Sequence, residues 1–471
     1  METFGWLSVL PPVLAIVLAI KTKQVFISLF FGIWLGWVIL SSWNPIVGTV
    51  RALDACVHVF KEPDNTKVIM FSALMGALIA FTQYSGGMEG FVHWIEGRGL
   101  VRGRKQAGLL AWVVGMIIFV EANICVLISG AVARPLFDRF RVSREKLAYI
   151  CDSTSAPKCV LIPLNAWGAF IIGLLAEQEI ENPLGVMFSS MPFNFYAILA
   201  ILLVLAVILF ERDLGPMRKA ERRVREEGKL LRDGAEPVVS TEVTSMAKKE
   251  GVQARAVNML LPVLSMVVMM PLGLFITGRG NLMNGSGYTS VFWAVLVAIV
   301  LGGITYRIQK IMTLRELMDL LMRGVGGMMP LAILMMFAFA IGATCRQLGT
   351  GLFVATVAKT ALPTEIIPAL LFLVSSFIAF STGTSWGTFA IMVPIGVPMI
   401  SMMGLHPGIV VGAVLGGGVF GDHCSPISDT TIIASMASAT DHIDHVRTQL
   451  PYAVAAGGVA VVLYLIFGVL L

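Results

Sequence analysis

The sequence predicts an all-α protein that crosses a membrane many times and is built from two inverted repeats. Of its 471 residues, 57% are apolar and 13% are charged, and the mean hydropathy is +0.84, values typical of polytopic membrane proteins. One strongly charged stretch, residues 211–255, separates two apolar blocks of similar length. Each block contains a polar interruption at a corresponding place, which is the pattern of a transporter with a central binding site.

Short matches in the same order indicate that the second block duplicates the first. The LPPVL run at 10–14 resembles LPVL at 261–264, and DSTSAP at 152–157 resembles DHCSP at 422–426. We therefore expect a first repeat over 1–210, a charged cytoplasmic linker over 211–255 and a second repeat over 256–471. Each repeat would have about five spanning helices, a re-entrant hairpin and a broken helix.

The first repeat is expected to begin with a spanning helix at residues 5–20, because no basic segment or cleavage site marks a signal peptide there. Basic clusters flank the apolar stretch 107–133 on both sides. Because Lys and Arg gather on the cytoplasmic side, a crossing would put one cluster on the wrong side. We therefore expect a hairpin at about 107–133, followed by a broken helix at about 147–176 that is interrupted around Asp152.

The second repeat is expected to mirror the first. A hairpin at about 366–403 would have its polar tip at Ser381–Ser385, and a broken helix at about 408–438 would be interrupted around Asp422. This scheme gives about ten spans of membrane length. It places both termini outside and the chain in a bacterial inner membrane.

Several function classes are excluded by the sequence. It has no Walker-type phosphate loop, so ATP hydrolysis by this chain is not expected. Its six cysteines have neither disulfide nor metal-ligand spacing. The net charge of +5 comes from basic loops and not from a nucleic-acid surface. We expect neither an enzyme nor a resident cofactor, but a transporter of a cation, with membrane lipid around it.

The polar interruptions are candidates for ion sites, because charge at bilayer depth costs about 2.5–3.5 kcal/mol and usually marks a transport path. Sodium is bound by hard oxygen ligands, from hydroxyls, amides, carboxylates and unwound backbone. The first site would combine Glu121, Asn123, Asp152, Ser153, Thr154 and Ser155. The second would combine Ser381, Thr382, Thr384, Ser385, Asp422, Ser425, Ser428, Asp429 and Thr430, with Na+ itself at Asp422, Ser425, Thr382 and Thr384.

The carboxylates are also candidates for carrying protons. Desolvation favours the protonated carboxyl and a bound cation favours the carboxylate, so Na+ and H+ would compete for one site. Asp422 and Glu121 are the leading candidates for this switch. The alternatives are structural: single Ser and Thr hydroxyls often bond to their own helix, and Asp429 could cap a half-helix.

Lys158 is the unusual charge of the first interruption. It could replace a sodium ion, pair with Asp152 or Glu121, hold the carboxylate of an organic substrate, or extend towards an interface. Asn165, Trp386 and His423 are further candidates for contact with a solute, with packing as the alternative for the last two. The HIDH run at 442–445 has some metal-ligand character, but a solvated cluster at a helix end is the favoured interpretation.

Three motifs resemble the NhaC-type sodium/proton antiporter family. They are GDHCSPISDTT at 421–431, SREKLAYI at 143–150 with DST at 152–154, and TGTSWGT at 382–388. The resemblance implies a rigid scaffold domain, a moving domain that carries both hairpins, elevator-type motion and a homodimer, as in the related divalent-anion/sodium symporters. It also implies exchange of cytoplasmic Na+ for external H+.

Two departures from the family pattern keep a second function open. Relatives commonly have paired acids where this chain has the single Glu121, and an apolar residue where Lys158 stands. The alternative is a Na+-coupled symporter or exchanger of a small carboxylate or amino acid, with Lys158 contacting the substrate carboxylate.

Overall fold

The computed structural model describes residues 4–22, 24–96, 101–119, 122–163, 165–237, 248–281 and 285–471. Within these ranges the regular structure is helical, apart from one isolated bridge between Pro237 and Asp441. Eight of the described helices are long and apolar enough to cross a membrane, or up to nine if one bent pair counts as a single span. The expected all-α, multi-pass fold is confirmed, while the inverted repeats stay a prediction.

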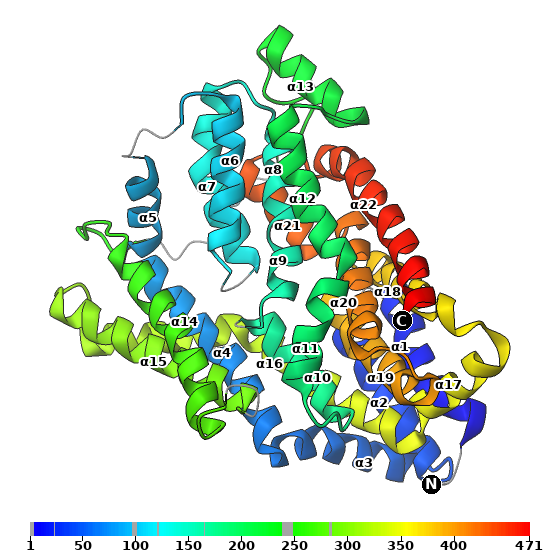
Figure 1. Cartoon of the computed structure of the whole chain (residues 1–471). Helices are drawn as coiled ribbons and strands as arrows, with labels where there is room; N and C mark the ends of the chain where they lie inside the picture. Colours follow the sequence, from blue (N-terminus) through cyan, green and yellow to red (C-terminus); the bar gives the residue numbers. More distant parts are fainter. Residues whose placement is uncertain are drawn as a thin grey trace.

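The helices of the first half are mostly short (Figure 1). The apolar helix expected at 5–20 is present, but as a short one, so that it falls below the usual spanning length. In chain order the elements are η1 Gly5–Val9, α1 Leu10–Thr22, α2 Val25–Leu40, α3 Pro45–His58, η2 Val59–Lys61, α4 Pro63–Tyr84, α5 Gly87–Glu96, α6 Arg104–Ile117, α7 Ala122–Arg139, α8 Arg144–Ser153, α9 Ala156–Leu161, α10 Ala166–Glu177, α11 Pro183–Ser190, η3 Met191–Phe193 and α12 Phe195–Phe210.

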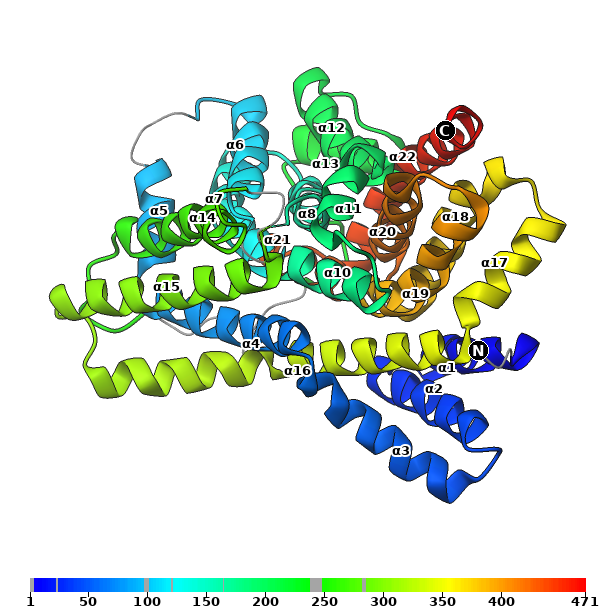
Figure 2. The ribbon, with the colours of Figure 1, turned by 60° about the horizontal axis from the view of Figure 1, so that its bottom comes forward.

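The second half begins after the charged helix α13 of the linker and contains the longest helices, α16 and α22. Figure 2 shows α16 running across the width of the molecule alongside α4. In chain order the elements are α13 Gly215–Glu227, α14 Val257–Thr277, α15 Gly287–Ile308, α16 Leu314–Leu348, α17 Thr350–Ala361, η5 Thr364–Ile366, α18 Ile367–Thr382, α19 Ser385–Met403, α20 Pro407–Cys424, α21 Asp429–Ser438 and α22 His442–Leu470.

Close helix contacts in the outer part of the molecule depend on glycine. A Cβ added to Gly76 of α4 would lie 2.0 Å from the carbonyl oxygen of Gly324 on α16. Small residues allow such close approach, which is how helices in lipid gain van der Waals contact without a hydrophobic driving force. The pair α4–α16 therefore forms a tightly packed support for the centre.

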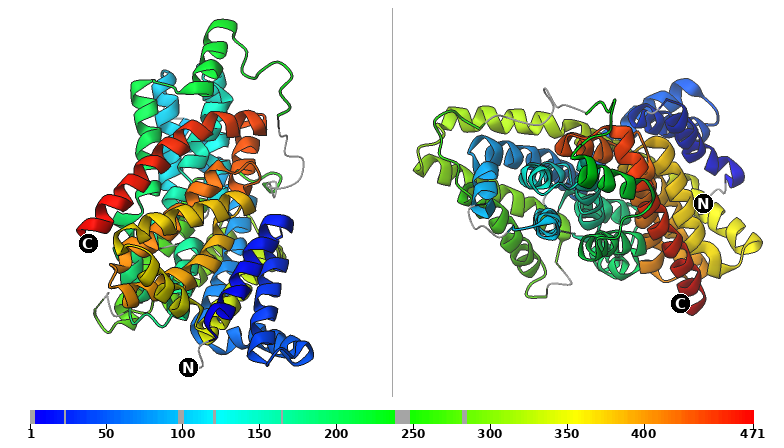
Figure 3. Two further views of the ribbon diagram at one scale, coloured as in Figure 1. Left: turned by 90° about the vertical axis from the view of Figure 1, so that its right-hand side faces the viewer. Right: turned by 90° about the horizontal axis from the view of Figure 1, so that it is seen from above.

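The interrupted helices meet in the centre. The helix α8, which precedes the first interruption, packs against α21, which follows the second one, and α9 packs against α20. The helix pair α6–α7 packs against α8, and the pair α18–α19 packs against α20. Figure 3 shows α22 in red along one side of the molecule, where it packs against α8, α20 and α21.

Local sequence explains the second interruption. Pro426 disfavours a helical conformation at the residue before it, and Ser425 is extended, with φ −83° and ψ 127°, so α20 ends there. Ser428 then caps α21 by accepting a hydrogen bond from the Thr431 N–H. The alternative that Asp429 is the cap is wrong, because Ser428 occupies that position.

The nearby helix pair α18–α19 turns at Gly383, which has a φ of +69°. A Cβ at this position would lie 2.6 Å from the carbonyl oxygen of Ile427 in the interruption between α20 and α21. Only glycine therefore allows both the left-handed turn and the close approach of the two segments.

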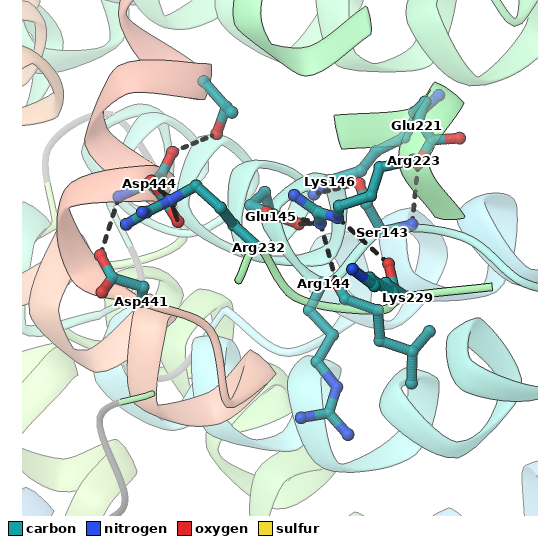
Figure 4. A network of polar contacts seen from close by, with 12 residues as sticks. Ser143, Arg144, Glu145, Lys146, Glu221, Arg223, Lys229, Arg232, Asp441 and Asp444 are labelled. Atoms are coloured by element: carbon teal, nitrogen blue, oxygen red, sulfur yellow. Dashed lines mark hydrogen bonds and ion pairs between the residues drawn. The ribbon is translucent and has the colours of Figure 1, made fainter. Parts of the chain in front are cut away.

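The charged linker docks on one end of the molecule through ion pairs (Figure 4). Arg223 pairs with the buried Glu145 at 2.9 Å, and Arg232 pairs with Asp444 at 2.9 Å. Glu221 of α13 accepts a hydrogen bond from the Ser143 N–H at 2.8 Å. The linker thus fixes the first turn of α8, which leads to the first interruption, and the first turn of α22, which follows α21.

Candidate functional site

The site is built around Asp152, which is fully buried on α8. Its Oδ2 accepts hydrogen bonds from Thr431 Oγ1 at 3.1 Å and from Gln449 Nε2 at 2.6 Å. The other oxygen, Oδ1, lies 4.0 Å from Nε2 of the buried His423. The partners of Asp152 therefore come from α20, α21 and α22 of the second half. Since burying a carboxylate without partners is costly, these contacts are what allow it to remain in the core.

Asp422 is also fully buried, one residue before His423 on α20. Its Oδ2 lies 3.3 Å from Ser385 Oγ and 3.5 Å from Thr430 Oγ1. These two hydroxyls stand at the N-terminal ends of α19 and α21. The positive ends of two helix dipoles thus face one carboxylate, which favours negative charge there.

His423 joins the two aspartates. Its Nδ1 lies 3.0 Å from the hydroxyl of Tyr196 on α12, and its backbone carbonyl accepts from Gln449 Nε2 at 3.0 Å. Gln449 therefore binds both Asp152 and the backbone carbonyl of His423, the residue after Asp422. The two polar interruptions, far apart in the sequence, form one buried cluster.

The predicted hydroxyl ligands divide into two groups. Ser385, Thr430, Ser425 and Ser428 belong to the buried cluster, and Ser425 Oγ donates to the Phe380 carbonyl of α18 at 2.8 Å. The hydroxyls of Thr154, Ser155 and Thr382 instead donate to carbonyls of their own helices. For these three residues the structural alternative holds, in which the hydroxyl bonds to the backbone of its own helix.

The remaining predicted ligands lie away from the centre of the cluster or outside the described residues. Ser153 is buried, while Ser381 and the helix-capping Thr384 are half-buried. Glu121 lies outside the described residues. The side chains of Asn123 and Asp429 also lie outside the described part of the structure.

Lys158 is buried in α9 and points at the helix pair α6–α7. Its ammonium donates to the carbonyl oxygens of Gly115 and Ile118, and lies 3.1 Å from Cys125 Sγ. Within the described residues no carboxylate lies within ion-pair distance of it. The three acceptors use all three N–H bonds of the ammonium.

The carbonyls that surround Lys158 belong to the end of α6, which finishes at Ile117. The last carbonyls of a helix have no partner within the helix and carry partial negative charge. Such carbonyls coordinate cations in broken-helix transporters. Lys158 thus supplies positive charge where unwound backbone could otherwise bind an ion.

Asn165 and Trp386, predicted to contact a solute, make contacts within the protein. Asn165 caps α10 through the Gly168 N–H, and its amide donates to the Phe119 and Cys159 carbonyls at 3.2 and 3.0 Å. The Trp386 ring lies 5.0 Å from that of Trp167. Asn165 therefore ties the first interruption to the end of α6, and the two tryptophans join α10 to α19.

The sequence interpretation missed Gln449, Thr431 and Tyr196, which complete the cluster. Gln449 is fully buried in the polar first part of α22, one turn after His445. Nothing in this polar sequence distinguishes Gln449 from its exposed neighbours. The partners of Gln449, Thr431 and Tyr196 therefore follow only from the fold.

The oxygen atoms of the cluster are hard ligands of the kind that small cations prefer. In the described residues no group of three His, Cys, Asp or Glu side chains could hold a metal ion. One carboxylate with several hydroxyl and carbonyl oxygens suits a hard monovalent ion such as Na+. The same carboxylate can take up a proton instead.

Comparisons with known proteins agree with this chemistry. Residues 158–469 match the model of the Na+/H+ antiporter family. An uncharacterized protein of Haemophilus influenzae is 33% identical over 98% of this chain and 90% of its own length. The malate-2H(+)/Na(+)-lactate antiporter of Bacillus subtilis is 36% identical over 20% of each chain.

The solved structure of the Alcanivorax borkumensis YdaH transporter has a similar fold. The TM-score is 0.61 at 13% sequence identity, and the match covers 89% of this chain and 88% of that one. The relatives with stated roles are transporters and not enzymes.

Proposed function

Since the chain belongs to the Na+/H+ antiporter family, we propose that this secondary transporter exchanges cytoplasmic Na+ for external H+ across the bacterial inner membrane. The observation that carries the proposal is the buried cluster around Asp422 and Asp152. Both carboxylates are fully buried and are held by hydroxyls, an amide and helix N-termini. A carboxylate kept at such depth without a transport role would cost stability and gain nothing.

In the proposed cycle Asp422 binds either Na+ or H+. With Na+ bound, the hydroxyl oxygens of Ser385 and Thr430 turn their lone pairs to the ion; without it, both hydroxyls lie within hydrogen-bond distance of the carboxylate. Exchange follows if the empty, charged site does not cross the membrane, because an unpaired buried carboxylate is costly. We further propose an elevator motion of the helices that carry this site, in a homodimer.

We propose that each chain binds one cation and not two. The ammonium of Lys158 already supplies the positive charge at the end of α6, through the carbonyls of Gly115 and Ile118. A second Na+ at that place would meet a fixed cation. The three acceptors around Lys158 support its role as a built-in cation. They argue against contact with a substrate, because the ammonium of Lys158 has no N–H left to donate.

A second candidate function is exchange or symport of a small carboxylate or amino acid with Na+. It is favoured by one relative, named for malate, lactate, protons and Na+, which resembles one fifth of the chain. In this case Lys158 would have to leave its carbonyl partners in order to reach the substrate carboxylate.

Transport by the purified protein in liposomes separates the two candidates. A pulse of external Na+ should make the lumen alkaline, as H+ leaves in exchange, when no organic solute is present. The second candidate is supported instead if Na+ moves only when malate, lactate or an amino-acid mixture is added. No movement of Na+ or H+ under either condition would refute both.

Asp422→Asn should abolish the exchange, because the amide can bind neither a proton nor Na+ with the strength of a carboxylate. Asp64→Asn is the control, since Asp64 is half-exposed at the start of α4 and pairs with Lys67 at 2.9 Å. Exchange by Asp422→Asn at the rate of the control would show that Asp422 is not the central ligand.

A further inference from the structure

A line of three polar side chains leads from the surface to the buried cluster. Ser435 of α21 lies between two histidines of α22, with its Oγ 3.0 Å from His442 Nδ1 and 2.9 Å from His445 Nδ1. Ser435 and His445 are fully buried, and His442 is half-buried at the start of its helix. The expectation that the histidines form a solvated cluster is therefore wrong for His445.

The other ring nitrogen of each histidine has a fixed partner. Gln449 Nε2 donates to Asp152 and to the His423 carbonyl, so its Oε1, 3.0 Å from His445 Nε2, must accept. His445 therefore carries a hydrogen on Nε2. His442 Nε2 lies 2.6 Å from the Pro426 carbonyl, which can only accept, so this nitrogen also carries a hydrogen.

Both Nδ1 atoms consequently depend on one hydroxyl. When both histidines are neutral, each Nδ1 is an acceptor, and the Thr431 carbonyl, 2.9 Å from Ser435 Oγ, is a third acceptor for the single O–H of Ser435. At least one Nδ1 then lacks a donor, which is unfavourable. One additional proton removes the conflict, because the protonated Nδ1 becomes a donor and the hydroxyl serves the other ring.

We propose that His442, Ser435 and His445 form a proton relay from the surface to His445, which lies beside the buried cluster. The proposal rests on the proposed Na+/H+ exchange. A proton on His442 Nδ1 passes to Ser435 Oγ while the Ser435 hydroxyl proton passes to His445 Nδ1. The hydroxyl is regenerated, and His442 becomes neutral. The new imidazolium N–H on His445 then faces the carbonyl oxygen of Thr431 at 3.2 Å.

Buried ionisable residues surround the inner end of the relay. Asp152 approaches from α8 and His423 from α20, both through Gln449, and Tyr196 of α12 bonds to His423. The helix α18 has no titratable side chain. A proton on His445 thus places positive charge behind Gln449, on the side of the buried Asp152.

Two contacts hold the start of α22, which carries His442, in place (Figure 4). Asp441 caps the helix by accepting from the Ile443 and Asp444 N–H groups, and Asp444 pairs with Arg232. His442 lies between these two anchored residues. By the distribution of basic residues this end of α22 faces the cytoplasm.

The relay is tested by the rate of Na+-driven proton movement in liposomes at several pH values on the His442 side. Ser435→Ala should slow the movement about tenfold, since it removes the hydroxyl that transfers the proton. Ser435→Thr should retain the rate. Ser438→Ala is the matched control. The Ser438 hydroxyl is equally buried on α21 and, like that of Ser435, bonds to carbonyls of its own helix, but within the described residues it does not contact a histidine.

A chemical rescue keeps the test independent of folding. His442→Ala should also be slow, and added imidazole should restore its rate, because the small base can take the place of the partly exposed ring. Imidazole should not rescue Ser435→Ala. The relay is refuted if Ser435→Ala is as fast as Ser438→Ala, or if imidazole leaves His442→Ala unchanged. A wild-type protein that moves no protons with Na+ would refute the proposed exchange instead, and the same variants would then be measured with a carboxylate as the driving solute.

Discussion

At the scale of single residues, charges in the core are explained by their partners and not by their distance from lipid. Lys158 satisfies carbonyls at the end of α6. Asp152 accepts from hydroxyl and amide donors of the other half of the chain, and Asp422 lies near hydroxyls of its own half. A buried charge whose partners are removed destabilises the fold by several kcal/mol. Single substitutions in this region should therefore change ion binding and stability together.

Lys158→Ala should create a cation site where the ammonium was. The freed carbonyls of Gly115 and Ile118 would each cost about 1–3 kcal/mol if left without a partner. Na+ should recover part of this loss, by about 2.7 kcal/mol when its concentration is about 100 times its Kd. The measurement is the unfolding midpoint in Na+ against choline.

Lys359→Ala is the control for this prediction, since Lys359 also donates to a carbonyl, that of Met402, but is exposed. Its unfolding midpoint should respond to Na+ as the wild type does. An equal response of Lys158→Ala would contradict the role of Lys158 as a built-in cation.

At the scale of elements, the turn between α18 and α19 illustrates how one residue positions a helix pair. Gly383→Ala should lower stability by about 1–2 kcal/mol for the left-handed backbone alone. It should also reduce exchange, because the added Cβ would meet the Ile427 carbonyl at 2.6 Å. The measurements are thermal unfolding and Na+-driven proton movement.

Gly404→Ala provides the comparison at the opposite end of α19. Gly404 has nearly the same φ, +70°, but open space where the Cβ would be. Gly404→Ala should therefore lose the same stability for its left-handed backbone, but it should keep the exchange activity. Equal activities of the two variants would show that the contact between the turn and Ile427 is unimportant.

The start of α22 should respond to acid through its cap. Burial raises the pKa of Asp441, but the N–H groups of Glu236, Asp444 and Ile443, with Arg232 nearby, together hold that pKa below the ordinary value of 3.8. A lowered pKa means that the cap stabilises fully above pH 3.8, and that this contribution is lost as the pH falls through the folded-state pKa.

Asp441→Ala should destabilise by about 1 kcal/mol at neutral pH, the usual value of an N-cap. The difference in unfolding free energy between Asp441→Ala and the wild type should shrink below pH 3.8. Asp441→Asn keeps a capping side chain but no charge, so its stability should lack this acid dependence. Unfolding midpoints between neutral and acid pH test this, and a constant difference between Ala and wild type would contradict it.

At the scale of the whole molecule, the charged linker makes ion pairs of unequal burial. Glu145 and Arg223 form a largely buried pair, whereas Lys229 and Asp233 form an exposed one. Removing one partner of a buried pair leaves an uncompensated charge, but exposed pairs contribute little and are screened by salt.

Glu145→Ala should therefore cost about 3–5 kcal/mol and loosen the linker from α8. Asp233→Ala, which breaks the exposed pair and leaves every trypsin site in place, should change stability by less than about 0.5 kcal/mol. Thermal unfolding and the rate of tryptic cleavage within residues 212–237 measure the two effects. Similar cleavage of both variants would show that the linker is not held by the Glu145–Arg223 pair.

The sequence by itself determined the fold class, the transporter family and the two polar interruptions. Long apolar segments are required in lipid, and a proline or aspartate within them stands out because few residues are tolerated there. Hence the regions around Asp152 and Asp422 could be named without coordinates, and the family match agrees with the motif at 421–431.

Only the tertiary structure decided which polar groups face one another. Asp152 meets Gln449, distant by 297 positions, and Lys158 turns to the carbonyls of α6 and not to an acid. The hydroxyls of Thr154 and Ser155 bond to their own helix, which no local pattern distinguishes from ion binding. Side-chain direction in an apolar helix depends on its neighbours, and the neighbours are set by packing between distant segments.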